Sequence, residues 1–116
     1  MPLFPRNIVL IGARGAGKST VGRLLGKRLA RHFVDTDDLI ADWEGMTVGE
    51  VFAAYGEDYF RDVEASVVAD VTARGNKVIA VGGGAVLRPE NVERLAASGV
   101  LVWLRAPSAA PTSRMS

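Results

Sequence analysis

The chain has 116 residues, of which 48% are apolar, 23% charged and 7% aromatic. This composition is typical of a soluble globular domain, and the length is too short for a second hydrophobic core. Fourteen Lys and Arg against thirteen Asp and Glu leave a formal charge of +1, which predicts neither nucleic acid nor an anionic membrane as a partner. The absence of cysteine excludes disulfides, cysteine-ligated zinc and a thiol nucleophile. No apolar run is long enough for a membrane span or a signal peptide, so the cytoplasm is the expected compartment.

The first half of the chain predicts two strands with a helix between them. Residues 8–11 form an apolar run that ends in glycine, the pattern of a strand buried on both faces. From Lys18 onward, apolar residues at helical spacing lie opposite basic ones, which predicts an amphipathic helix. A second short strand is expected over residues 33–35, and a turn with a partly buried Trp43 indole is expected over residues 43–46. The predicted apolar face of the helix consists of Val21, Leu24, Leu25 and Leu29.

The second half predicts further helices and strands in alternation. Thr47 and Glu50 have the spacing of a capping box at the start of a short helix, which Gly56 would end. The predicted fold class is therefore a three-layer α/β fold, with a parallel sheet of four recognisable strands and helices on both faces. The remaining predicted elements are a helix over about residues 59–73, a strand over 78–81, a helix that begins at Pro89 and a strand over 100–104.

A phosphate-binding motif lies between the first strand and the first helix. Residues 12–19, Gly-Ala-Arg-Gly-Ala-Gly-Lys-Ser, match G-x-x-x-x-G-K-[ST] in the strand-to-helix context that the motif requires. Backbone N–H groups of such a loop turn toward phosphate oxygens, and the helix N-terminus adds partial positive charge. Lys18 would neutralise the β- and γ-phosphates of ATP, and Ser19 would ligate Mg²⁺. The alternative is a glycine-rich turn that only joins strand to helix. The predicted nucleotide-binding residues are Gly12, Gly15, Ala16, Gly17, Lys18, Ser19 and Thr20.

Three carboxylates lie at the end of the second predicted strand, where ligands of open α/β sheets bind. In an extended chain Asp35 and Asp37 point to the same side. One of them could then orient Mg²⁺ and its waters, while the other accepts hydrogen bonds from a substrate hydroxyl. Asp38 would point away, and we interpret it as a cap of the following helix.

Two further clusters are compatible with ligand binding. Arg61 and Glu64 are neighbours on one face of a predicted helix, where a glutamate can hold an arginine as a fork for a carboxylate or phosphate. A solvated ion pair has the same spacing. The glycines at 82–84 follow a strand and indicate a close backbone approach, either to a ligand or within a tight turn. We interpret Trp103 as a core residue rather than a base-stacking one.

Together these clusters resemble the shikimate kinases, small P-loop kinases of aromatic amino-acid biosynthesis related to the nucleoside-monophosphate kinases. The motifs that carry the resemblance lie within residues 7–104. They are the phosphate loop, Val-Gly at 21–22, Asp-Thr-Asp at 35–37, Gly-Glu at 56–57, Phe-Arg-x-x-Glu at 60–64 and the three glycines at 82–84. The resemblance implies transfer of the γ-phosphoryl group of ATP to the 3-hydroxyl of shikimate. It implies that Lys18 and Asp35 are catalytic and that Ser19 and Asp35 lie at the metal. The implied shikimate contacts are Asp37, Arg61, Gly82, Gly83 and Gly84, with Glu64 supporting Arg61.

The resemblance ends after Leu104, where two prolines within five residues and no apolar period predict a disordered tail over 105–116. The family's lid arginine, its second carboxylate-binding arginine and its fifth strand are not matched, so we expect little activity from this chain. A complete family domain is expected to be a monomer, whereas here the last strand would be an exposed edge that permits self-association. Two other hypotheses are a nucleotide-binding remnant and a different small-molecule kinase, such as a gluconate kinase. The Asp-Thr-Asp and Phe-Arg-x-x-Glu combination argues against the latter.

Overall fold

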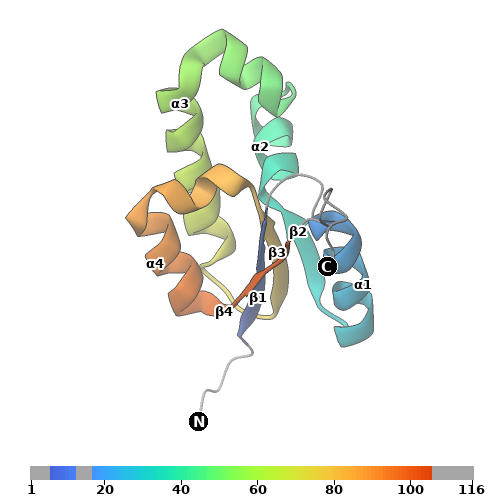
Figure 1. The fold of residues 1–116 in the computed structure, drawn as a ribbon. Coiled ribbons are helices and arrows are strands. Elements are labelled where there is room, and N and C mark those ends of the chain that lie inside the picture. Colours follow the sequence, from blue (N-terminus) through green and yellow to red (C-terminus); the bar gives the residue numbers. More distant parts are fainter. Residues whose placement is uncertain (1–5, 13–16, 106–116) are drawn as a thin grey trace, which may run out of the picture.

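A four-stranded parallel sheet organises the molecule. The structure is a computed structural model that describes residues 6–12 and 17–105. The described strands lie in the order β2-β3-β1-β4. Helix α1 lies on one side of the sheet and α3 and α4 lie on the other (Figure 1), which confirms the predicted three-layer fold. The elements are β1 (Asn7–Ile11), α1 (Lys18–Leu29), β2 (His32–Asp35), α2 (Thr36–Glu44), α3 (Val48–Val71), β3 (Lys77–Val81), the 3₁₀ helix η1 (Gly83–Leu87), α4 (Pro89–Ser98) and β4 (Gly99–Trp103).

Two predicted features fall on residues outside the described part of the chain. The predicted contacts of Gly15 and Ala16 lie outside the described residues, as does the predicted disorder of the tail beyond Arg105. Within the described part of the chain, no helix combines the length and the apolar character needed to cross a membrane.

Helix α2 begins directly at the end of β2 because Asp35 caps it. The Asp35 carboxylate accepts hydrogen bonds from the backbone N–H groups of Asp37 and Asp38, at 2.9 and 3.4 Å. The capping role that we predicted for Asp38 is therefore wrong, since Asp38 lies inside the first turn. The predicted turn over 43–46 begins only at Gly45, and Trp43 lies within α2 with 64% of its surface exposed instead of partly buried.

Helix α3 consists of two helical segments joined at Gly56. The predicted capping box is confirmed: the Glu50 N–H donates to Thr47 Oγ1 at 3.1 Å, and the Thr47 N–H donates to Glu50 Oε1 at 2.8 Å. At Gly56 the backbone leaves the helical region, with φ 86° and ψ 174°. This φ favours glycine, and the change of direction lets the second segment run back along the sheet.

The main core lies between the sheet and helices α2, α3 and α4. Alternate side chains of β1 and β3 point into it, and each fully buried aliphatic side chain stabilises the fold by about 1.5–3 kcal/mol. This packing fixes α3 relative to the carboxyl ends of β1 and β3. The buried members of the cluster are Val9, Ile11, Ile40, Val51, Phe60, Val67, Val68, Val71, Ile79, Val81, Ala85 and Leu95.

The face of α1 that packs against β2 is not the one we predicted. Gly22 and Gly26 are buried, and a Cβ atom at Gly22 would lie 2.2 Å from the Phe33 ring. Leu24 and Leu29 are instead 51% and 45% exposed, so their predicted inward orientation is wrong. The reason is steric: the helix approaches β2 so closely that only residues without a side chain fit between them.

Strand β4 forms one edge of the described sheet. It pairs with β1 in parallel, and its side chains at Val100 and Trp103 are 53% and 63% exposed. The core role that we predicted for Trp103 is therefore wrong. The strand contains neither charge nor proline, the two residue features that commonly prevent an edge from pairing with another chain.

We expect the chain to self-associate through this edge. Lysine in place of Val100 should shift the population toward monomer, because a charged side chain on an edge strand disfavours strand pairing. Size-exclusion chromatography with light scattering over a range of concentrations measures the effect. The matched control is Leu87→Lys, which replaces a residue that is 67% exposed on η1. A monodisperse monomer of the unsubstituted chain at high concentration would contradict the expectation.

Candidate active site

A cavity of about 600 Å³ lies at the carboxyl ends of the strands, where parallel α/β sheets bind their ligands. Three predicted motifs meet there: the start of α1, the junction of β2 with α2, and the loop after β3. Separate stretches of sequence therefore contribute to one site. The lining residues are Gly17, Lys18, Ser19, Thr20, Asp35, Asp37, Asp38, Val81, Gly82 and Gly83.

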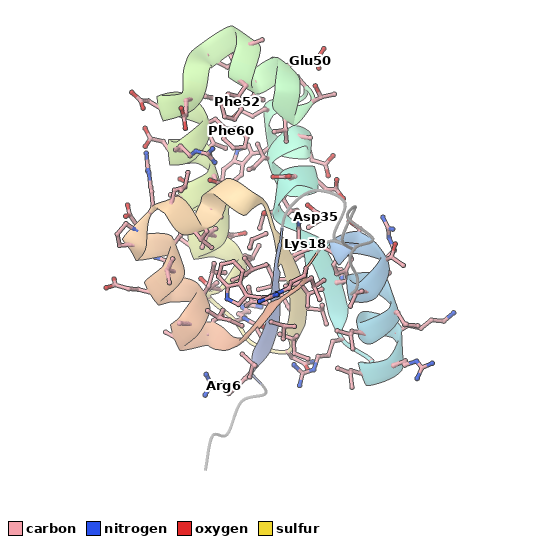
Figure 2. The ribbon with its side chains drawn as sticks, in the orientation of Figure 1. Arg6, Lys18, Asp35, Glu50, Phe52 and Phe60 are labelled. Carbon is pink, nitrogen blue, oxygen red and sulfur yellow. The ribbon has the colours of Figure 1, made fainter. Side chains whose placement is uncertain are left out.

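Lys18 and Ser19 connect the phosphate-loop motif to the aspartates. Lys18 is the first residue of α1, and its Nζ donates a hydrogen bond to the Gly12 carbonyl across the loop. Ser19 Oγ donates to Asp35 Oδ2 at 3.2 Å. Figure 2 shows Lys18 and Asp35 at the same end of the sheet. A hydroxyl, a carboxylate and an ammonium group thus converge at the N-terminus of α1.

The aspartates reach the cavity by a different geometry from the one that we predicted. The strand ends at Asp35, so Asp37 and Asp35 do not alternate along an extended chain. The first turn of α2 instead places Asp37 and Asp38 on the cavity wall. Desolvation raises the pKa of Asp38, and the neighbouring charge of Asp35 raises it further. Three carboxyl groups therefore line the same cavity as Lys18.

A partly buried arginine, Arg61, pairs with a buried glutamate, Glu64, on the second segment of α3. Arg61 Nη1 donates to Glu64 Oε1 at 2.9 Å, and Glu64 is only 1% exposed, so the solvated alternative is wrong. The guanidinium carbon lies 5.6 Å from the Phe52 ring centroid and 5.3 Å from that of Phe60. Glu57 Oε2 lies 3.5 Å from Arg61 Nε. The sequence analysis gave neither Phe52 nor Glu57 a role in the site. The i,i+4 spacing of Glu57 and Arg61 was the available signal for an ion pair.

The glycines after β3 allow these side chains to approach the loop. A Cβ atom at Gly84 would lie 2.1 Å from Arg61 Nη1, and one at Gly82 would lie 3.0 Å from Asp37 Oδ1. The loop also turns tightly, since the Ala85 N–H donates to the Gly82 carbonyl at 3.0 Å. Arg61 does not line the cavity, but it contacts Gly84, one residue beyond the cavity wall at Gly83.

Burial raises the pKa of the Glu64 carboxyl above its usual 4.5; pairing with Arg61 offsets part of the rise, and the charge of Asp37 adds to it. An acid with a raised pKa binds extra protons on folding. Its contribution to stability is fully present below about pH 4.5 and is lost as the pH rises through the raised pKa.

Glu64→Gln should remove this pH dependence, because glutamine stays neutral. As the pH rises above about 4.5, the unfolding temperature of the wild-type chain should fall relative to that of the variant. Thermal denaturation followed by circular dichroism at several pH values measures the difference. Parallel curves for the two proteins would show that Glu64 does not titrate with a raised pKa.

Comparison with known proteins decides the family. The family model for shikimate kinase matches residues 14–116, a range that continues past Leu104. The chain belongs to the shikimate kinase family. A shikimate kinase of Symbiobacterium thermophilum is 57% identical over 100 residues, which make up 86% of this chain and 58% of that protein. The chain thus spans little more than half the length of such relatives.

Solved shikimate kinases share the fold. The enzyme of Acinetobacter baumannii, determined in complex with shikimate, has a TM-score of 0.86 at 42% identity and covers 89% of this chain, which spans 57% of that structure. The enzyme of Aquifex aeolicus has a TM-score of 0.81 at 37% identity over 87% of this chain, which spans 60% of that structure. A gluconokinase of Sinorhizobium meliloti has a TM-score of 0.52 at 21% identity, which is a likeness of fold alone.

Proposed function

We propose that this chain provides the ATP and shikimate sites of a shikimate kinase, which transfers the γ-phosphoryl group of ATP to the 3-hydroxyl of shikimate. The observation that carries the proposal is that the phosphate-loop residues, the aspartates and the glycine loop line one and the same cavity. The bound shikimate of the A. baumannii relative supports the choice of substrate. Phosphoryl transfer requires mainly positioning and charge neutralisation, which are what these residues can supply.

The nucleotide would bind with its phosphates at the N-terminus of α1. Lys18 Nζ, which donates to the Gly12 carbonyl in this structure, would turn to the β- and γ-phosphate oxygens. The helix N-terminus favours negative charge at this position. Gly12, Gly17 and Thr20 would complete the described part of this site.

The residues beside Lys18 fit Mg²⁺. Octahedral Mg²⁺ binds oxygen at about 2.0–2.1 Å, so two adjacent ligands lie about 3 Å apart. Ser19 Oγ and Asp35 Oδ2 are separated by 3.2 Å, close to that spacing. No group of three His, Cys, Asp or Glu side chains among residues 6–12 and 17–105 is placed to hold a metal. Mg²⁺ would take its other ligands from phosphate and water, and it would neutralise the charge of the phosphates.

Shikimate would bind between the aspartates and the glycine loop. Arg61 would bind its carboxylate, because Glu64 and two aromatic rings hold the guanidinium in place before the ligand arrives. Asp37, on the cavity wall, would accept hydrogen bonds from the ring hydroxyls and direct one of them toward the phosphates. The backbone of residues 82–84 would pack against the ring.

Isothermal titration tests the proposal at the level of binding, because it measures affinity without requiring turnover. MgATP and shikimate should each bind the chain, and shikimate should bind in the presence of a non-hydrolysable ATP analogue. A titration with gluconate is the control, because a gluconate kinase is the alternative small-molecule kinase. Binding of MgATP without shikimate would overturn the assigned substrate and favour the nucleotide-binding remnant.

A further inference from the structure

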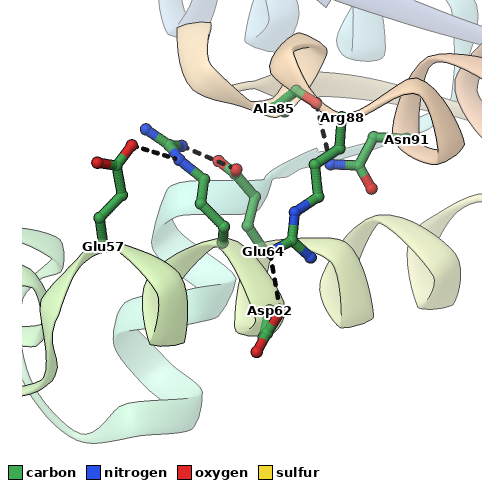
Figure 3. Close-up of polar contacts among 7 residues, drawn as sticks. Glu57, Asp62, Glu64, Ala85, Arg88 and Asn91 are labelled. Atoms are coloured by element: carbon green, nitrogen blue, oxygen red, sulfur yellow. Dashed lines mark hydrogen bonds and ion pairs between the residues drawn. The ribbon is translucent and has the colours of Figure 1, made fainter.

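The environment of Arg61 contains one group that the proposed function does not use. Glu64 binds Nη1 at 2.9 Å, and the rings of Phe52 and Phe60 restrict tilting of the guanidinium plane. On the other edge, Glu57 Oε2 lies 3.5 Å from Nε (Figure 3). Glu57 and Glu64 therefore flank the same guanidinium from two turns of α3.

The Nε–H edge of Arg61 depends on Glu57. Nε is buried and makes no hydrogen bond within the described residues. Its interaction with the Glu57 carboxylate, at 3.5 Å, is an ion pair. A single hydrogen bond at Nη1 leaves the guanidinium able to pivot about that contact when the side-chain torsion angles change. A second carboxylate at Nε restrains that rotation, because two points define the direction of an edge.

We propose that Glu57 is a positioning residue for the substrate carboxylate. By holding Nε while Glu64 holds Nη1, it fixes the direction in which the guanidinium presents its remaining N–H groups to the ligand. The inference rests on the proposed function, in which Arg61 binds the carboxylate of shikimate. Misplacement of a binding group by a fraction of an ångström weakens the contact that it makes.

Glu57 can be substituted with little effect on the fold, because its side chain is not part of the core. Its side chain is 62% exposed, and exposed ion pairs add little to stability. The residue directly follows the break at Gly56, so its negative charge also favours the start of the second helical segment. Aspartate keeps that charge but withdraws the carboxylate by one methylene, whereas glutamine keeps the length and an acceptor oxygen.

The experiment compares Glu57→Asp, Glu57→Gln and Glu57→Ala by isothermal titration. We expect the aspartate and alanine variants to bind shikimate roughly two- to fivefold more weakly, the range of an exposed ion pair, and glutamine to restore part of the loss. MgATP affinity and the unfolding temperature should not change. A shikimate analogue with a carboxamide in place of the carboxylate should bind all variants alike. Asp58→Ala, which removes a neighbouring exposed charge, is the matched control.

Two results would overturn this inference and leave the proposed function in place. One is unchanged shikimate affinity in all three variants. The other is full affinity in the aspartate variant with loss in the glutamine variant, which would indicate a general charge effect. Failure of the unsubstituted chain to bind shikimate would instead overturn the proposed function, and this inference with it.

Discussion

Replacing Lys18 with alanine should abolish measurable binding of ATP while the fold remains intact. Lys18 lies at the start of α1, and its Nζ contacts the Gly12 carbonyl rather than the core. Each hydrogen bond to a charged group contributes about 1.5–3 kcal/mol, so the loss of two or more phosphate contacts weakens binding by at least about a hundredfold. Isothermal titration with MgATP, together with circular dichroism, measures both parts of the prediction.

The matched control for Lys18 is Lys27→Ala. Lys27 is an exposed lysine in the last turn of the same helix, so its removal changes the net charge equally without touching the loop. The control should bind MgATP as the wild-type chain does. Equal affinity of the Lys18 variant and the wild-type chain would remove the loop from the nucleotide site.

A methyl group at Gly84 should disrupt the shikimate site from outside the cavity wall. A Cβ atom there would lie 2.1 Å from Arg61 Nη1 and 2.5 Å from Cζ and Nη2, so the guanidinium must leave the position in which it binds Glu64. We expect Gly84→Ala to weaken shikimate binding at least roughly tenfold, the equivalent of one charge-assisted contact. Overpacking of this kind also costs about 1–3 kcal/mol of stability. MgATP binding should remain.

The control for Gly84 is Gly49→Ala in the first turn of α3. A Cβ atom at that position has no neighbour closer than 4.0 Å, and alanine is the better helix former. This variant should bind shikimate normally and be as stable as the wild-type chain or slightly more so. Normal shikimate binding by the Gly84 variant would show that Arg61 can relax into another arrangement without losing the ligand.

Several predictions from short-range patterns are confirmed. The apolar runs at 8–11 and 78–81 are buried strands, and the capping box at Thr47 starts a helix. These features depend on the side chains of a few consecutive residues. Where a prediction needed the distance between two elements, as for Leu24 and Trp103, it was wrong. Periodicity identifies an apolar face, but it contains no information on how closely a neighbouring element approaches.

The sequence by itself determined the fold class, the strand-to-helix context of the phosphate loop and the residue types available for a kinase site. The tertiary structure decided the strand order β2-β3-β1-β4, which places β3 beside both β1 and β2. That order brings Gly82 to within reach of Asp37 and places Gly84 against Arg61. The sequence does not reveal these contacts, because each of them joins residues more than twenty positions apart. Only the pairing of strands and the packing of α3 against the sheet can set their distances.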